Sequence, residues 1–224
     1  MQERALTLDS GIFPSPLGEA RVCPVGPPSI LTGVSGMATL LEYHACAVTE
    51  FSSRVHAIGS EHWHAPTPCT EWDVRELVNH LVNEQLWVPP LMNGATIAEV
   101  GDALDGDVLG EDPVAAWDAA AAAATDALSA EGALERVVHL SFADVAGEAY
   151  AWQLISDLTV HAWDLSQGIG SDPTIDGGLA TAVIIALTPD LASYAQYGLF
   201  APSLPVGDDA CSLDRLLALT GRQA

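Results

Sequence analysis

The chain has 224 residues and is strongly acidic, with 30 aspartate and glutamate residues, 7 basic residues and a formal net charge of −23. All seven basic residues are arginines, which excludes a lysine Schiff base, attachment of pyridoxal phosphate and a P-loop lysine. Nucleic acids and anionic membrane surfaces are poor partners, because cations supply most of the affinity for polyanions. We therefore expect neither nucleic acid nor membrane among the partners.

Hydrophobic residues make up 49% of the chain, which is enough for one sizeable core. The longest apolar runs fall far short of the roughly 20 residues that span a bilayer, so no transmembrane helix is expected. The stretch 11–28 is broken by glycine and proline and lacks the apolar segment of a secretory signal. We therefore expect a cytoplasmic protein.

Residues 1–36 differ from the rest of the sequence. They contain five prolines among glycines and show little periodicity, which is typical of a poorly ordered extension. From Met37 to about residue 59, apolar residues recur at three- and four-residue spacing, which predicts a first helix. We therefore divide the chain into an N-terminal extension, residues 1–36, and one domain, residues 37–224.

A second helix is predicted from Thr70, which is placed to accept backbone N–H groups as the N-cap. We expect it to end near Leu86, before Pro89–Pro90, because proline cannot continue the hydrogen-bond ladder of a helix. The acidic, glycine-punctuated segment 99–112 is expected to be a loop. The alanine-rich segment 114–128 predicts a third helix, because alanine has the highest helix propensity.

Residues 137–142 alternate and are partly β-branched or aromatic, which predicts a short strand or hairpin arm. Helical spacing returns at 148–167 and stops at glycines suited to a C-terminal cap. A further helix, interrupted by a proline, is expected over 178–197, and a short amphipathic helix over 212–219. The fold class predicted by these patterns is all-α: a helical bundle with a strand or hairpin insertion and a C-terminal helix.

Asp157 and His161 form the most informative pair in the sequence. They lie four residues apart in a predicted helix, so both side chains reach the same side and can bind one ion. They lie beside the apolar face of that helix, in a seam between helices where a carboxylate needs a counter-charge. Carboxylate and imidazole groups are ligands that zinc and other first-row metals accept. A simple salt bridge between the two side chains is the alternative.

A catalytic metal site needs a third protein ligand and one open position for water or substrate. His80, in the second predicted helix, is the best candidate, although it shares its side with acidic residues, including Glu84, that we expect at the surface. Asp164 is expected to orient a metal ligand or to cap a neighbouring group. Cys69 has no base identifiable from the sequence and is expected to be a buried structural thiol.

Two segments carry a resemblance to a known family. PTPCTEWDVRELVNHLV at 66–82 and DLTVHAWDLSQGIG at 157–170 are similar to the mycothiol-dependent maleylpyruvate isomerase N-terminal domain family. This family belongs to the DinB-like superfamily of metal-binding four-helix bundles, which is found largely in actinobacteria. Its members bind a divalent metal, usually zinc, through a histidine of the second helix and an acidic residue and a histidine of a later helix. The resemblance therefore implies a metal site made of His80, Asp157 and His161.

The resemblance also implies a type of chemistry. Enzymes of this superfamily resemble thiol transferases, in which the metal deprotonates a low-molecular-weight thiol such as mycothiol. We therefore expect a zinc-dependent transferase or isomerase that uses mycothiol as co-substrate and acts on a small electrophile. A metal-dependent hydrolase and a non-enzymatic metal- or ligand-binding module are the alternatives.

The sequence departs from the isomerase type of this family in two places. The isomerase type resembles this chain but usually has glutamate at the position of Asp157, and it carries a further C-terminal domain. Here only about two dozen residues follow Pro202. The resemblance therefore favours the metal-bearing bundle over maleylpyruvate isomerisation as such.

Overall fold

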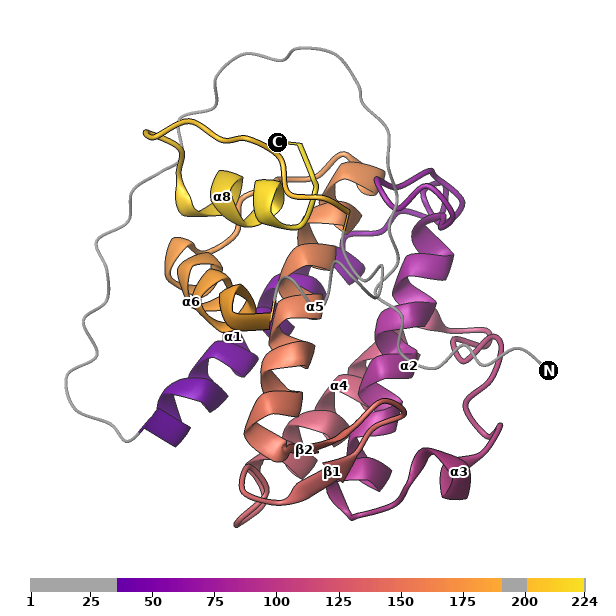
Figure 1. Cartoon of the computed structure of the whole chain (residues 1–224). Helices are drawn as coiled ribbons and strands as arrows, with labels where there is room; N and C mark the ends of the chain where they lie inside the picture. Colours follow the sequence, from indigo (N-terminus) through magenta and orange to yellow (C-terminus); the bar gives the residue numbers. More distant parts are fainter. Residues whose placement is uncertain (1–35, 191–200, 224) are drawn as a thin grey trace.

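The computed structural model describes residues 36–190 and 201–223 (Figure 1). Within these residues the structure has seven α-helices, one 3-10 turn and one two-stranded hairpin. The elements are α1 (Gly36–Val55), α2 (Val74–Met92), α3 (Ile97–Val100), α4 (Pro113–Ser129), β1 (Val137–His139), β2 (Asp144–Ala146), α5 (Gly147–Ile169), α6 (Gly177–Leu187), the 3-10 turn Thr188–Asp190 and α8 (Ser212–Leu219).

Four long helices form the body of the molecule. α1 packs against α4 and α5, and α2 packs against the same two helices, so the four close into a bundle. α6 and α8 cover one end of α5, while the antiparallel hairpin β1–β2 lies at the opposite end (Figure 1). The predicted all-α bundle with a hairpin insertion and a C-terminal helix is confirmed.

Aromatic and small residues together fill the bundle core. The rings of Phe51 and Trp117 lie 4.7 Å apart between α1 and α4, and both side chains are fully buried. Trp117 also donates its indole N–H to the hydroxyl of Ser52 at 2.9 Å, which satisfies its only polar atom. Ala120 and Ala124 are buried on the same helix. The alanine-rich sequence therefore lets α4 approach its neighbours closely.

The start of α2 differs from the prediction by three residues. The N-cap is Asp73, whereas the sequence pattern placed the cap at Thr70. The Asp73 carboxylate accepts the backbone N–H of Glu76, and the Glu76 carboxylate accepts the backbone N–H of Asp73, each at 2.9 Å. This reciprocal capping box satisfies two backbone donors that a cap at Thr70 would leave to other partners.

The predicted end of α2 before Pro89–Pro90 was wrong, because the helix continues to Met92 with both prolines inside it. Each proline lacks the N–H that would bond back along the helix, but the φ angle of proline is compatible with helical backbone. Leu91 and Met92 are buried in the core. Burial of these two side chains offsets the two missing hydrogen bonds in the last turn.

The remaining predictions differ mainly at element ends. The segment expected as loop from residue 99 overlaps the short helix α3, whose N-cap Thr96 forms a second capping box. α5 ends as expected at a glycine cap, since Gly170 has the left-handed φ of 64°. α6 stops at Leu187, and residues 191–197 of the predicted helix lie outside the described residues. The predicted extension, residues 1–36, also lies outside them except for Gly36, where α1 begins.

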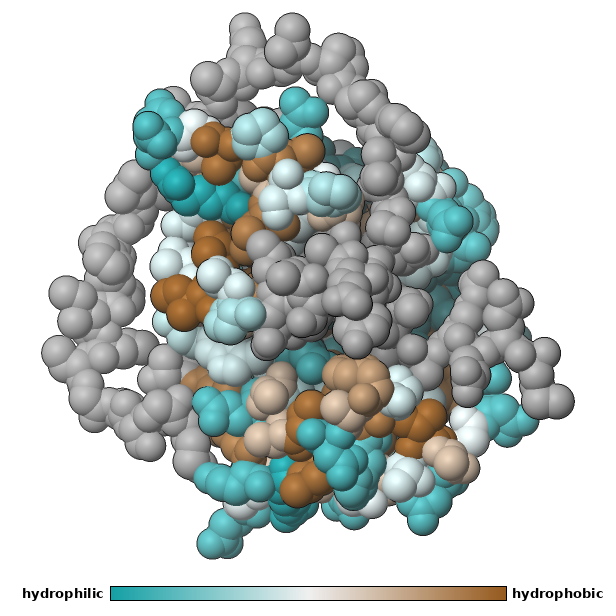
Figure 2. All heavy atoms as spheres, viewed as in Figure 1, coloured by the Kyte–Doolittle hydropathy of each residue, from teal (hydrophilic) through white to brown (hydrophobic). Residues whose placement is uncertain are grey.

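The surface is mixed in polarity. Figure 2 shows hydrophilic and hydrophobic residues interspersed over the hairpin end of the molecule, where Val137 and Phe142 are exposed. In the described part of the chain, no helix combines the length and the apolar character that crossing a membrane requires.

Candidate metal centre

The three side chains singled out by the sequence meet where α2 packs against α5. His80 Nε2 lies 3.1 Å from Asp157 Oδ2, and His161 Nε2 lies 3.3 Å from Asp157 Oδ1. The two imidazole rings are 5.4 Å apart and nearly perpendicular. One ligand atom from each residue lies within 4.8 Å of the other two. The fold therefore brings the residues together, while metal ligation by them stays a prediction.

The position of α5 explains why these polar residues are buried. This helix is packed against α1, α2 and α6, and every residue from Leu154 to Ser166 is buried. Asp157 and His161 lie one turn apart on the side that faces α2, so their contact with each other follows from helix geometry. Their contact with His80 requires the two helices to pack at this level of the bundle.

The charges of Asp157 and His161 depend strongly on their neighbours. Burial by itself would raise the pKa of Asp157, but the neighbouring His80 and His161 outweigh it and hold that pKa below its usual range. Burial would likewise lower the pKa of His161, yet the charge of Asp157 and the hydrogen bond to Asp164 raise it well above its ordinary value. The buried Asp157 carboxylate therefore favours a positive charge on His161.

One carboxylate oxygen of the cluster lacks a hydrogen bond. Asp157 Oδ1 is buried and has no hydrogen-bond partner of acceptable geometry among the described residues, although His161 Nε2 is 3.3 Å away. A buried carboxylate oxygen without a partner is costly. Two imidazole nitrogens and this oxygen form an N₂O donor set, which zinc and other first-row divalent ions accept. The residues present therefore fit a divalent cation.

A second layer of contacts lies behind His161. Its Nδ1 is 2.9 Å from Asp164 Oδ2, and Asp164 also accepts hydrogen bonds from Arg222. A carboxylate on Nδ1 fixes the tautomer that leaves Nε2 as the metal ligand. The expected orienting role of Asp164 therefore agrees with its geometry.

Cys69 is buried, as predicted, but it does have polar neighbours. Its Sγ lies 3.4 Å from Asp164 Oδ2 and 3.8 Å from His161 Nδ1. The thiol donates to Asp164, so it belongs to the layer of contacts that supports His161. Sequence reasoning missed these neighbours because about ninety residues separate Cys69 from them, and only the packing of the chain before α2 against α5 brings them together.

Sequence reasoning also missed Trp72 and Glu84. The Trp72 ring lies 4.6 Å from that of His80 and 5.9 Å from that of His161, so it forms an aromatic wall of the cluster. Glu84 was expected at the surface but is partly buried, and burial together with the nearby Asp157 raises its pKa well above the usual range. The spacing of one helical turn between His80 and Glu84 could have indicated that both face α5.

Comparison with known proteins identifies the family of this chain. The family described as mycothiol maleylpyruvate isomerase N-terminal domain matches residues 44–166, which is more than half of the chain. The chain belongs to this family. The matched region runs from α1 into α5 and contains His80, Asp157 and His161. The match to the mycothiol maleylpyruvate isomerase N-terminal domain family covers most of the four-helix bundle of this chain, whereas α6 and α8 follow the matched residues.

Two curated relatives are uncharacterized proteins of Mycobacterium tuberculosis, from strains CDC 1551 / Oshkosh and ATCC 25618 / H37Rv. Each is 28% identical over 187 residues, which cover 80% of this chain and 95% of the relative. No solved structure matches the chain. The similarity to these relatives therefore extends beyond the matched family region but brings no assigned reaction with it.

Proposed function

We propose that this protein binds one divalent cation, with zinc as the expected ion, through His80, Asp157 and His161. The observation that carries the proposal is the buried Asp157 carboxylate, which faces His80 with Oδ2 and His161 with Oδ1 and whose Oδ1 has no hydrogen-bond partner of acceptable geometry among the described residues. Three protein ligands would leave one coordination position for a small molecule, as in catalytic zinc sites.

A cation accounts for the hydrogen bonds of His161 better than a salt bridge alone does. Without an ion, both ring nitrogens face carboxylates, Nδ1 toward Asp164 and Nε2 toward Asp157, so both must carry protons for both contacts to be favourable. With an ion, a neutral ring keeps Nδ1–H on Asp164 and offers the lone pair of Nε2 as a ligand. The second arrangement buries no protonated imidazole.

The family supports a thiol as the bound small molecule. We infer that the thiol is mycothiol, from the description of the family to which the chain belongs. A zinc ion held at this site would favour the thiolate form of a coordinated thiol at neutral pH, which is the nucleophilic form. Trp72 limits water on one side of the site because its ring packs on both imidazoles. The protein would then act as a thiol-dependent transferase or isomerase.

The arginines favour a second substrate with little negative charge. Each arginine that the structure describes already donates to an acceptor of the protein itself, so a carboxylate of the substrate would have to compete with these hydrogen bonds. Their acceptors are carbonyl or carboxylate oxygens, for Arg54, Arg75, Arg136, Arg215 and Arg222. We therefore propose a small electrophile without several carboxylates.

Metal analysis of the purified protein tests the proposal. We expect about one divalent ion per chain, and we expect His161→Ala to remove most of it. The matched control is His56→Ala, because His56 is a half-exposed histidine that pairs with Asp118 at 2.9 Å, away from the site. Protein that holds no ion after incubation with zinc would refute the proposal and favour the salt bridge.

A spectroscopic test separates thiol chemistry from hydrolysis. In cobalt-substituted protein, binding of mycothiol should add sulfur-to-metal charge-transfer bands, because sulfur would become a ligand. His161→Ala should abolish these bands. If mycothiol leaves the spectrum unchanged while small anions that replace water alter it, the hydrolase alternative replaces the thiol transferase.

A further inference from the structure

Arg222, near the C-terminal end of the chain, reaches into the layer of contacts behind His161. Its Nε lies 2.9 Å and 3.1 Å from the two carboxylate oxygens of Asp164, and its Nη2 lies 2.7 Å from Oδ2. Asp164 is fully buried, and the Arg222 side chain is 13% exposed. A guanidinium that holds both oxygens of a buried carboxylate fixes the orientation of that carboxylate as well as its charge.

The backbone of the C-terminal segment is shaped to place this arginine. After α8 the chain turns at Gly221, whose φ of 76° favours glycine. A Cβ added at Gly221 would also clash with Ala201. The backbone N–H of Arg222 donates to Leu217 O at 2.7 Å. Because Leu217 is buried, α8 is anchored on the body and carries Arg222 to Asp164.

These contacts form a chain from the C-terminal segment to the candidate metal centre. Arg222 contacts Asp164, Asp164 contacts His161 Nδ1 at 2.9 Å, and His161 Nε2 faces Asp157. Among the described residues, the side chains that bond to Asp164 are Cys69, His161 and Arg222, so loss of Arg222 would remove the only arginine of this set. The Asp164 carboxylate would then be free to turn away from the His161 ring or toward Cys69.

We propose that Arg222 is a positioning residue of the metal centre: through Asp164 it holds His161 with Nδ1–H toward Asp164 and Nε2 toward Asp157. This inference rests on the proposed function. It makes the segment from α8 to Arg222 a working part of the centre, although this segment lies outside the region matched by the family.

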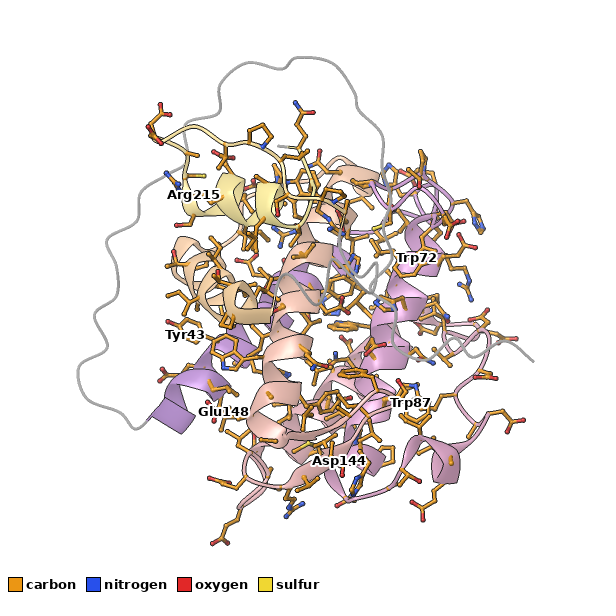
Figure 3. The ribbon with its side chains drawn as sticks, viewed as in Figure 1. Tyr43, Trp72, Trp87, Asp144, Glu148 and Arg215 are labelled. Atoms are coloured by element: carbon orange, nitrogen blue, oxygen red, sulfur yellow. The ribbon has the colours of Figure 1, made fainter. Side chains whose placement is uncertain are left out.

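The affinity of the full chain for Co²⁺ tests this role. We expect Arg222→Gln to weaken the affinity about 10- to 100-fold, as loss of an orienting partner of a metal-bound histidine does. Arg222→Lys, which keeps the charge but not the two-point contact, should restore part of it. Arg215→Gln is the matched control, because Arg215 lies on α8 at the outer edge of the molecule (Figure 3) and its guanidinium donates to the backbone carbonyls of Asp208 and Ala210.

A double-mutant cycle and a second readout separate positioning from general destabilisation. In an Asp164→Asn background, Arg222→Gln should cause little further loss of Co²⁺ affinity, because Arg222 acts on His161 through the Asp164 carboxylate, which this background lacks. In ion-free protein, ¹⁵N NMR of the imidazoles should show His161 with Nδ1 protonated in the wild type and an altered protonation pattern in Arg222→Gln. A merely structural role would not change that pattern in a variant that still folds.

The outcomes also distinguish this inference from the proposed function. Wild-type protein that binds no ion refutes the proposed function, and Arg222 is then judged by the NMR pattern alone. Wild-type protein that binds Co²⁺, with Arg222→Gln within twofold of it and an unchanged NMR pattern, overturns the positioning role only. If Arg222→Gln does not fold, Arg222→Lys decides: a several-fold loss of affinity supports the role, and wild-type affinity overturns it.

Discussion

His44 offers a quantitative test of the buried polar groups in this fold. The side chain lies on α1, is 1% exposed, and its Nε2 has no hydrogen-bond partner among the described residues. Burial lowers the pKa of His44 from 6.5 to about 4, since the charged ring would lose its hydration. The folded state therefore binds a proton more weakly than the unfolded state does, and stability must fall as the pH falls from about 6.5 toward 4.

The expected effect follows from these two pKa values. Between about pH 7.5 and about pH 5, the His44 ring should remove about 2 kcal/mol from the free energy of unfolding. His44→Leu places an apolar side chain of similar size at the buried site, and leucine cannot bind a proton. The loss of stability over this pH range should therefore be smaller by about 2 kcal/mol in His44→Leu than in the wild type.

Urea unfolding at the two pH values, with a chelator present in every sample, measures the difference directly. His56→Leu serves as the control, because it makes the same replacement at a side chain that is half exposed and not buried in the core. If His44→Leu and the wild type lose the same stability between the two pH values, the ring titrates as it does in water, and the argument from burial fails.

Three further predictions concern charge, packing and ion uptake. The net charge of −23 implies self-repulsion, so sodium chloride should raise the midpoint of thermal unfolding, and a midpoint independent of salt would contradict this. Gly147→Ala should lower the free energy of unfolding by about 1–3 kcal/mol, because the new Cβ would clash with the backbone oxygen of Ala133. Gly177→Ala should not, because an added Cβ there has nothing within 4 Å. Despite burial, Asp157 raises the pKa of His161, so zinc must displace a proton from this ring when it binds. Calorimetry in buffers of different ionisation enthalpy should therefore detect proton release, and the affinity for zinc should increase with pH. Zinc binding that does not depend on pH would argue against His161 as a ligand.

Local signals in the sequence were sufficient for most of the fold. Hydrophobic periodicity, helix propensity and glycine placement act over a few residues, so they located the alanine-rich helix, the end of α5 and the short helix α8. The end of α2 was the clear failure, because Pro89–Pro90 is a local stop signal. Burial of Leu91 and Met92 against other elements overrides that signal, and such burial depends on tertiary packing.

The same division holds for the candidate metal centre. The sequence alone determined the juxtaposition of Asp157 and His161, since residues four apart on a helix always lie on one side, and it supplied the strong negative charge and the absence of lysine. Only the tertiary structure decided that His80 of α2 meets them, that Trp72 covers the two imidazoles, and that Arg222 reaches Asp164 across 58 residues of sequence. These contacts depend on how separate helices pack, and helical periodicity gives the face of each helix without stating which face of another helix lies opposite.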